Sequence, residues 1–380
     1  MISYLLPTHN RPERLRQTLD AIARLERAGH ESIGGAEVIV IDNASEPPVT
    51  LPAALKNGWP LRLIRRATNE GAAARNAGVN LAHGEWIVML DDDSYPLDDG
   101  HIEVLLDAPV DVAAIGGDIV LPNGDRESGG LPEVIIGCGA AIRRAVFLDV
   151  GGYDPAFDYY AEEYDLCAKL LLSGWRVIHD HRFRVRHEKV AAGRDMNRIL
   201  HRLVRNNCWI LQRYAPSDCR EREIGETIAR YAQIAMKENA ACGFAAGMAD
   251  LLRTIPDQPR REMPHELYGR FTGFSYAHQA LSDQLSRGIH EAVAVVDRGK
   301  NAAAIDQALG EIGCRIVDDE RHADWLVIGS LSPGPMLDAF ERRSGGHQPV
   351  LLPWRPLNAL SAGKTKLRQT AARAPARCRS

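Results

Sequence analysis

Short apolar runs alternate with polar segments of helical spacing along the first half of the chain. The apolar runs cover residues 4–6, 38–41, 61–64 and 86–90. Between the first two runs, Leu15, Leu19 and Ile22 recur at a helical interval. Short apolar runs bounded by polar residues are typical of buried strands. Strands that alternate with helices predict an α/β fold with a Rossmann-like, mostly parallel sheet and helices on both faces.

The first helix is predicted from about residue 11 to residue 25. Asn10 is a favourable N-cap residue, and Glu13 stands three positions later, in the position of a capping box. A second helix is predicted after Asn69, where residues 69–78 change from a loop into an Ala-rich segment.

Polar residues follow each predicted strand, and ligands of such sheets bind outside the carboxyl ends of the strands. Thr8, Asp42 and Asn69 follow the first three strands, and three consecutive acids, Asp91 to Asp93, follow the fourth. Carboxylates this close repel one another unless a cation compensates their charge. Their hard oxygen atoms suit Mg²⁺ or Mn²⁺, and such an ion commonly binds a diphosphate. The alternative is a solvated acidic loop that begins a turn.

A second acidic group, Glu162–Glu163–Tyr164–Asp165, precedes the apolar residues 166–171 and is predicted to begin a helix. Carboxylates are favoured at a helix N-terminus because the helix dipole stabilises them, and this effect alone accounts for the acids. A catalytic role needs only one of them to face the crevice.

The ordered set of motifs resembles family 2 of the inverting nucleotide-sugar glycosyltransferases, which have the A-type glycosyltransferase fold. The resemblance covers about residues 1–215 and is carried by the following segments: Pro-Thr-His-Asn-Arg at 7–11, Ile-Asp-Asn-Ala-Ser at 41–45, Asn-Glu-Gly-Ala-Ala-Ala-Arg-Asn at 69–76, Leu-Asp-Asp-Asp at 90–93, Gly-Gly-Tyr-Asp at 151–154, Glu-Glu-Tyr-Asp at 162–165, and His187. Each motif alone is weak, but the order of the set is specific.

The resemblance implies a nucleotide-sugar pocket formed by these motifs. The residues it assigns to that pocket are Pro7, Thr8, Asn10, Asp42, Asn69, Gly71, Arg75, Asp91 and Asp92. Within this set Asp42 would accept a hydrogen bond from the base of the nucleotide, although it could instead cap a turn. Arg75 could likewise be a charge on a helix surface.

The metal-binding residues implied by the resemblance are Asp93, Asp91 and His187, with Asp93 as the direct ligand and Asp91 nearer the ribose. His179 and His181 are alternatives to His187. Asp118 is a further candidate for contact with the donor sugar.

The resemblance also implies an acid at position 163 that acts as the catalytic base. The family usually has Glu-Asp-x-Asp here, and Glu163 replaces the Asp of that motif, which keeps Glu162 as the alternative base. The implied reaction moves a sugar from a nucleoside-diphosphate sugar, UDP- or dTDP-linked, to a hydroxyl group of a saccharide, polysaccharide or lipid-linked acceptor. A carboxylate takes the hydroxyl proton in such a reaction.

The second half of the chain is predicted to contain a helical extension at 216–287 and a small Rossmann-like module at 288–355, after a catalytic domain at 1–215. The module lacks Gly-x-Gly-x-x-Gly after its first strand and has Asp297–Arg298–Gly299–Lys300 instead, which argues against a dinucleotide site. Residues 356–380 hold six Lys or Arg and no acid, and this composition predicts a disordered tail.

A helical face with Arg202, Arg205, Trp209 and Arg213 fits either packing against the core or peripheral contact with anionic lipid. No apolar run approaches the roughly 18 residues that cross a bilayer, and the seven cysteines lack Cys-x-x-Cys spacing. With a net charge of −4, the composition predicts a cytoplasmic enzyme, with the inner membrane face as an alternative location and no nucleic-acid partner.

Two other functions fit parts of the pattern. A sugar-nucleotide pyrophosphorylase shares the sheet and the metal, but Pro7–Thr8–His9–Asn10 occupies the place of its Gly-rich loop. A non-catalytic nucleotide-sugar sensor is the other alternative. Carboxylates at both the metal position and the base position argue for catalysis, while Glu in place of Asp at 163 keeps the sensor open.

Overall fold

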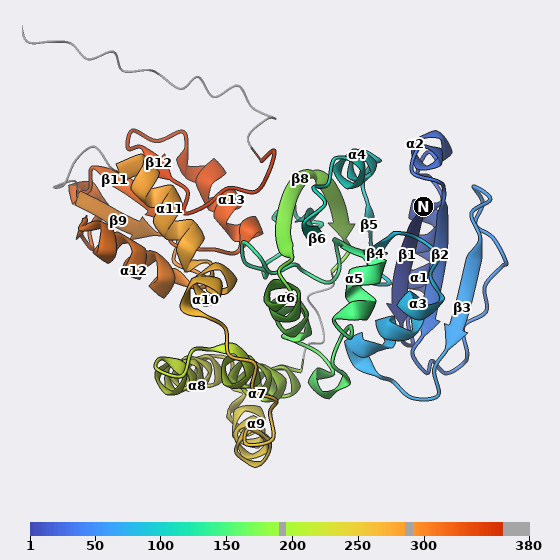
Figure 1. Ribbon diagram of the computed structural model, residues 1–380, viewed down its shortest axis with the longest axis horizontal. Helices are drawn as coiled ribbons and strands as arrows, with labels where there is room; N and C mark the ends of the chain where they lie inside the picture. The colour runs from blue at the N-terminus through green and yellow to red at the C-terminus, as the bar shows by residue number, and fades with distance from the viewer. Residues whose placement is uncertain (190–194, 286–291, 360–380) are drawn as a thin grey trace, which may run out of the picture.

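The computed structural model describes residues 1–189, 195–285 and 292–359 and contains two separate sheets (Figure 1). The larger sheet has eight strands in the order β3-β2-β1-β4-β7-β6-β8-β5. The strands are β1 (Ile2–Thr8), β2 (Ala36–Asp42), β3 (Leu61–Arg65), β4 (Trp86–Met89), β5 (Ser94–Pro96), β6 (Val112–Val120), β7 (Ala140–Arg143) and β8 (Arg176–His187). Strand β7 is antiparallel to both of its neighbours and β5 is antiparallel to β8, while the other pairs are parallel. The predicted α/β class with a mostly parallel sheet is confirmed.

Both faces of this sheet are buried, which explains the continuous apolar runs. Successive residues of a strand point to opposite faces, and Leu5 packs into one apolar cluster while Tyr4 and Leu6 pack into another. The surrounding helices are α1 (Pro12–Ile22), α2 (Arg27–Glu31), α3 (Arg75–Leu81), α4 (Gly100–Leu106), α5 (Arg144–Asp149) and α6 (Glu162–Leu172), with short 3₁₀ turns at Gly71–Ala74 and Pro155–Phe157.

The predicted N-cap of the first helix is wrong. Arg11 is the N-cap residue, and it makes no side-chain cap bond. Asn10 has a φ of 56°, and its side-chain oxygen accepts a hydrogen bond of 2.8 Å from the backbone of Glu46. Asn10 therefore fixes the neighbouring loop after β2 instead of the helix.

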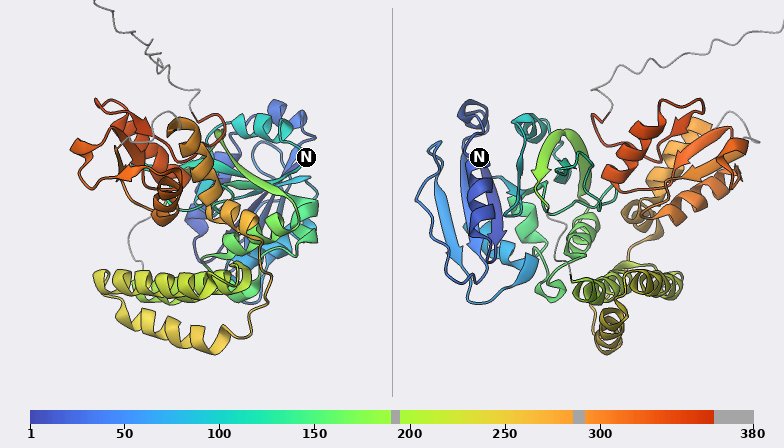
Figure 2. Two further views of the ribbon diagram at one scale, coloured as in Figure 1. Left: turned by 60° about the vertical axis from the view of Figure 1, so that its left-hand side comes forward. Right: turned by 180° about the vertical axis from the view of Figure 1, so that it is seen from behind.

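The helical region comprises α7 (Met196–Tyr214), α8 (Arg220–Lys237), α9 (Ala241–Thr254), α10 (His265–Thr272) and α11 (Phe274–Leu285). Within it, α7, α8 and α9 lie below both sheets in the two views of Figure 2, whereas α11 packs beside the smaller sheet against α12 (Ala302–Ile312). Across the described residues, no helix combines the length and the apolar character that crossing a membrane requires.

The α7 face that carries the three arginines packs against the protein. Arg202 pairs with Asp158, and Arg213 lies 2.8 Å from Asp165. Trp209 is 4% exposed and donates a hydrogen bond of 3.0 Å to Thr254. This face is therefore not available to lipid, and membrane contact through another surface stays a prediction.

The C-terminal module has a four-stranded parallel sheet in the order β10-β9-β11-β12. Its elements are β9 (Ala292–Val296), α12 (Ala302–Ile312), β10 (Arg315–Ile316), a 3₁₀ turn at Glu320–His322, β11 (Trp325–Ile328), α13 (Pro333–Arg343) and β12 (Val350–Leu351). The small α/β module predicted from the sequence is present.

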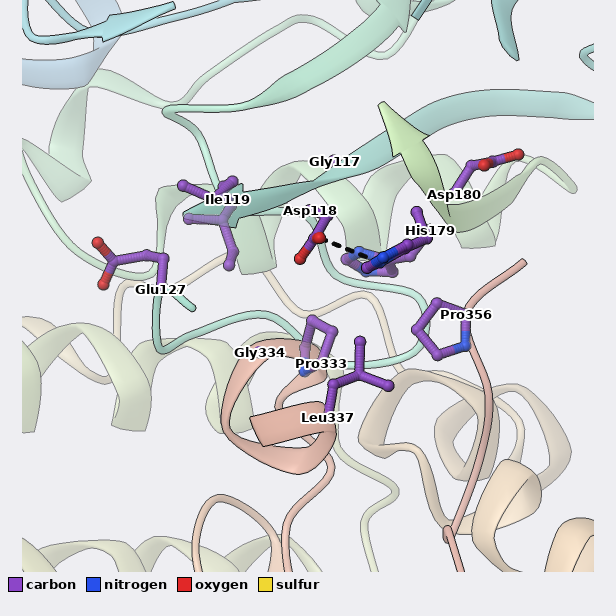
Figure 3. Close-up of a pocket in the computed structure, with 12 residues that line it drawn as sticks. Gly117, Asp118, Ile119, Glu127, His179, Asp180, Pro333, Gly334, Leu337 and Pro356 are labelled. Carbon is purple, nitrogen blue, oxygen red and sulfur yellow. Dashed lines mark ion pairs between the residues drawn. The ribbon is translucent and has the colours of Figure 1, made fainter. Parts of the chain in front are cut away.

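The module packs directly on the larger sheet through α13 (Figure 3). Asp118 lies 3.0 Å from Arg126 and 3.0 Å from His181, and Arg126 also lies 2.6 Å from Asp338 of α13. Asp118 therefore belongs to this interface, and its predicted contact with the donor sugar finds no support. One apolar cluster includes Leu170 of α6, Phe271 of α10 and Val327 of β11, so the hydrophobic core is continuous between the sheets.

The predicted domain boundaries stay predictions. The boundary at 215 falls between α7 and α8. The boundary at 287 lies outside the described residues, as does most of the predicted tail, from residue 360 onward.

Candidate active site

A cavity of about 1520 Å³ lies between the larger sheet, the helical region and the C-terminal module. Helices α6, α7, α8 and α10 and the turn between β9 and α12 all contribute to its lining. Five residues predicted from the sequence line it together: Arg75, Asp91, Glu162, Glu163 and His187. The predicted base and part of the predicted metal group therefore face the same space.

A buried arginine, Arg75, and a partly exposed acid, Asp91, form an ion pair at one end of the cavity. Arg75 is 5% exposed, pairs with Asp91, and donates a hydrogen bond of 3.2 Å to the carbonyl group of Leu90. Burial lowers the pKa of Arg75, but the charge of Asp91 outweighs it and raises that pKa above its usual value. The Nε atom of Arg75 is buried without a hydrogen-bond partner, so this end retains an unused donor.

Asp92 and Asp93 are held by Arg11 at the start of α1. Arg11 lies 2.7 Å from Asp92 and also binds Asp93, and Thr8 donates a hydrogen bond of 2.8 Å to Asp92. Burial raises the pKa of Asp92 to about 7. Burial also acts to raise the pKa of Asp93, but His187 and Arg11 outweigh it and lower that pKa to about 2. Asp93 is therefore the ionised member of the two.

His187 connects Asp93 to a second group of side chains. Its Nε2 atom lies 3.4 Å from Asp93, while its Nδ1 atom lies 2.9 Å from Glu127 and 3.6 Å from the sulfur of Cys138. Burial lowers the pKa of His187, but Asp93, Cys138 and Glu127 outweigh it and raise that pKa to about 12. A carboxylate on Nδ1 is the usual arrangement for a histidine whose Nε2 atom binds a metal.

Donor atoms of Asp91, Cys138 and His187 lie within 4.8 Å of one another, which fits a metal site. Burial raises the pKa of Cys138 to about 11, so its sulfur is a thiol at neutral pH. The thiolate is the form that binds metals. The group without an ion therefore holds the Asp91 carboxylate next to a protonated thiol and a protonated imidazole, and a cation that binds His187 has to displace the imidazole proton. His179 instead bonds the carbonyl group of Leu131, and His181 pairs with Asp118, so neither joins this group.

Apart from Arg75 and Asp91, the residues predicted to bind the nucleotide sugar do not line the cavity. Asp42 is fully buried and accepts backbone hydrogen bonds from Ser45 at 2.8 Å and Val49 at 3.1 Å. It caps the turn after β2, and a hydrogen bond to a base stays a prediction. Pro7 is the residue before the last one of β1 and lies beside Ile41 of β2.

Asn69 and Gly71 shape the loop before α3. The Asn69 side-chain oxygen accepts hydrogen bonds from Asn43 at 2.9 Å and from the backbone of Gly71 at 3.0 Å. Gly71 has a φ of +61°, and a Cβ atom there would lie 2.3 Å from the carbonyl oxygen of Asp158. This loop is therefore fixed against the segment that precedes α6, and contact with a nucleotide stays a prediction.

Glu162 and Glu163 begin α6, as predicted, and both reach the cavity. Glu162 is 7% exposed, and its Oε2 atom has no hydrogen-bond partner. Glu163 is more exposed and accepts a hydrogen bond of 3.2 Å from the backbone of Gly137. Burial raises the pKa of both carboxyl groups, and that of Glu162 lies well above its usual value because the charge of Glu163 adds to burial. Because the pKa of Glu162 is raised more than that of Glu163, a proton shared by the pair favours Glu162 and the negative charge favours Glu163.

The segment before α6 has an unusual backbone that α7 holds in place. Asp158, Tyr160 and Ala161 all have positive φ values, from 61° to 71°. Such conformations cost on the order of 1–3 kcal/mol each in non-glycine residues and often occur at functional sites. The buried side chain of Asn206 donates to the carbonyl groups of Phe157, Tyr159 and Tyr160, at 2.9, 2.9 and 2.7 Å. Asn206 therefore positions the start of α6.

Sequence reasoning missed several residues of the site. Arg11, Glu127, Cys138 and Asn206 have no role in the predictions, although Cys138 lies in the small-residue segment 137–141 and Asn206 in the Arg-Asn-Asn-x-Trp stretch. Each acts through a partner at least 46 positions away in the chain, apart from any local pattern.

Comparison with known proteins identifies the class of the N-terminal part. Residues 3–133 match the family model "Glycosyl transferase family 2". This part of the chain is a family 2 glycosyltransferase domain, and the family predicted from the motifs is confirmed.

Two relatives share part of the sequence. An "Uncharacterized glycosyltransferase" of Haemophilus influenzae is 26% identical over 200 residues, which cover 45% of this chain and 62% of the relative. The "O-antigen biosynthesis protein RfbC" of Myxococcus xanthus is 24% identical over 231 residues, which cover 51% of this chain and 18% of the relative. The matched region spans less than two thirds of either relative.

Among solved structures, the mannosyltransferase PcManGT of Pyrobaculum calidifontis, in complex with GDP-Man and Mn²⁺, resembles this chain with a TM-score of 0.43 and 17% identity. The likeness covers 76% of this chain and 88% of that protein. Nothing about the site follows from a likeness of this size.

Proposed function

We propose that this chain is a metal-dependent inverting glycosyltransferase that moves a sugar from a UDP- or dTDP-sugar to a hydroxyl group of a saccharide, polysaccharide or lipid-linked acceptor. The observation that carries the proposal is the shared cavity. The Arg75–Asp91 pair and His187 line one end of it, and the ionised Glu163 faces the same space. The family 2 domain and the O-antigen relative support the saccharide chemistry.

Glu163 is the base in this mechanism. Its carboxylate takes the proton of the acceptor hydroxyl as the oxygen attacks the anomeric carbon and the bond to the diphosphate breaks on the opposite face. General-base catalysis contributes on the order of 10²–10⁴-fold in rate. The backbone N–H group of Gly137 holds the Glu163 carboxylate in place. The protonated Glu162 keeps the negative charge of the pair on Glu163.

Asp91, Asp93 and His187 are the proposed ligands of Mn²⁺ or Mg²⁺. Asp93 is ionised and lies 3.4 Å from the Nε2 atom of His187, while Asp91 faces the cavity. The ion, when bound, offsets the charge of the leaving diphosphate. Arg75 lines the same end and forms an ion pair with Asp91, so its guanidinium group lies where the donor phosphates are proposed to bind.

The test is release of nucleoside diphosphate from a panel of UDP-, dTDP- and GDP-sugars with Mn²⁺. We expect release from UDP- or dTDP-sugars, loss of release in Asp93→Ala, and no change in Asp111→Asn, a control on an exposed aspartate far from the cavity. Unchanged turnover in both Asp93→Ala and Glu163→Gln would contradict the site. Donor binding without any release would favour a sensor.

A further inference from the structure

The cavity extends from the catalytic carboxylates to the C-terminal module. The β9–α12 turn lines it with Gly299, Lys300 and Asn301, and α8 lines it with Arg230. Figure 1 shows α6, α8 and α12 arranged around this part of the molecule. The end of the cavity beyond Glu163 is therefore built by segments that lie outside the family 2 domain.

Lys300 lies at the position in the module where open parallel sheets bind their ligands. Strands β10 and β11 lie on opposite sides of β9, so the strand order reverses between β9 and β11. Ligands of open α/β sheets bind outside the carboxyl ends of the strands at such a point. Lys300 follows the carboxyl end of β9 at this position.

The turn that carries Lys300 is rigid. The carbonyl group of Lys300 accepts a hydrogen bond of 3.0 Å from Leu331, and the backbone of Gly299 donates one of 2.8 Å to Gly329. The side chain of Asn301 donates a hydrogen bond of 2.9 Å to the carbonyl group of Thr272 in α10. These bonds fix the direction in which Lys300 enters the cavity.

The Lys300 ammonium group has no anionic partner among the described residues. It lies 4.5 Å from the ring centre of Tyr164, one residue after Glu163. Burial lowers the pKa of Lys300 to about 8, while the charge of Glu163 acts to raise it. Lys300 is therefore a desolvated cation near the base.

Two more donors that have no anionic partner in the described ranges lie at the same end. Arg230 packs 5.1 Å from the ring centre of Tyr231 and forms no ion pair within the described part of the chain. The hydroxyl group of Tyr164 is buried without a hydrogen-bond partner. In contrast, Arg222 pairs with Glu226 and Lys189 with Glu127, so these cavity cations are already neutralised.

We propose that Lys300, Arg230 and the Tyr164 hydroxyl group form a subsite for an anionic group of the acceptor, a phosphate or a carboxylate, that places the acceptor hydroxyl beside Glu163. The proposal rests on the proposed glycosyl transfer and names the substrate class that the transferase takes. A desolvated ammonium group without an anionic partner, next to a second cation that forms no ion pair with any described residue, favours a ligand that supplies the missing charge. The C-terminal module thereby acts as an acceptor-binding element.

The experiment measures binding of small anions by calorimetry with the donor end occupied by UDP and Mn²⁺. The probes are glycerol phosphate for the phosphate group, glucuronate for the carboxylate group, and uncharged glycerol. The variants are Lys300→Gln and Arg230→Gln, with Lys300→Arg to retain the charge and Lys237→Gln as a matched control. Lys237 is exposed in the last turn of α8 and does not line the cavity.

We expect at least one anion to bind the unmodified protein and glycerol not to bind. Affinity should fall about tenfold or more in Lys300→Gln and in Arg230→Gln, because each loses a charged hydrogen-bond donor. Lys300→Arg should recover most of it, and Lys237→Gln should match the unmodified protein. The two anion probes decide between phosphate and carboxylate.

Equal anion affinity in all variants, or no binding of either anion, would overturn the proposal. A change in the pH profile of nucleotide release in Lys300→Gln without a change in anion affinity would also overturn it, since Lys300 would then act only on Glu163. A separate thermal-shift measurement with UDP and Mn²⁺ tests the donor end. If UDP gives no shift while the anion results hold, the proposed transfer fails and the anion subsite stands.

Discussion

The larger sheet of this molecule is mixed and the smaller one is all parallel, and the two present opposite charges to one cavity. Strand β4 of the larger sheet leads to Asp91, whereas β9 of the smaller sheet leads to Lys300. The acid is paired by Arg75 within the protein, and the lysine has no anionic partner in the part of the chain described. In both sheets the strand order determines which edge faces the cavity. Whether the charged residues at that edge already have partners indicates which ligand the edge binds.

The largest expected effect is on the rate of sugar transfer, without a change in donor binding. Glu163→Gln removes the base, so nucleoside diphosphate release should fall by about 10²–10⁴-fold. UDP binding should be unchanged. Arg75 and Asp91, which line the donor end of the cavity, pair with each other, and the Glu163 carboxylate bonds the backbone of Gly137 instead. Glu162→Gln is the matched control and should lose much less, since Glu162 already carries the proton. Equal losses in the two variants would reverse the assignment of the base.

The second effect tests the segment before α6, which Asn206 of α7 holds in place. Asn206→Leu leaves the carbonyl groups of three loop residues without their donor and should destabilise the fold by on the order of 3 kcal/mol. Urea unfolding measures this change. Asn207→Leu removes one hydrogen bond of 2.9 Å to the Leu203 carbonyl in its own helix and should cost much less. A smaller loss for Asn206 than for Asn207 would contradict its role as the clamp of this segment.

A third effect compares one glycine at each edge. Gly71→Ala places a Cβ atom 2.3 Å from the backbone of Asp158 at a φ of +61°, so it should lower stability by roughly 1–3 kcal/mol and reduce turnover. Gly299→Ala places its Cβ atom 2.9 Å from the Ser330 hydroxyl, a side-chain atom that can rotate away. Its unfolding midpoint should change less.

Gly35→Ala is the control for backbone strain alone, because Gly35 has a φ of +91° and nothing within 4 Å of the added atom. If Gly71→Ala is no more costly than Gly35→Ala, close approach to the loop before α6 does not decide its conformation.

The smallest effect is a shift in the pH profile of turnover. A base works only when deprotonated, and burial raises the pKa of Glu163 above its ordinary value. Turnover should therefore decline as pH falls through a value higher than the usual 4.5 of a glutamate. Initial rates at saturating donor across pH 4 to 8 would show this acid limb. If turnover instead declines with an apparent pKa at or below 4.5, Glu163 is not the group whose protonation stops the reaction.

Much of the fold and part of the site could be predicted from the sequence because local patterns encode them. The runs before Asp42 and Asp91 gave correct strands, and Glu162 begins a helix as its neighbours indicate. Asn10 shows the limit, because the capping pattern was present but its side chain bonds Glu46 instead.

The rest of the site depends on contacts between distant segments. Glu127, Cys138 and His187 meet only when β7 and β8 join the same sheet, and nothing in their separate neighbourhoods indicates the meeting. Lys300 was visible as the residue in place of a Gly-rich motif, but its entry into the catalytic cavity follows from the packing of the module. Local sequence carries no signal for that packing.

The shared hydrophobic core has a consequence for how this protein can be dissected. Apolar residues of α6, α10 and β11 belong to one cluster. Cutting the chain before residue 292 would therefore expose apolar surface on the N-terminal part that remains. Module swapping between related enzymes would have to carry α10 and α11 along with the smaller sheet. In a calorimeter the intact chain should melt as one cooperative body, with a single heat-absorption peak.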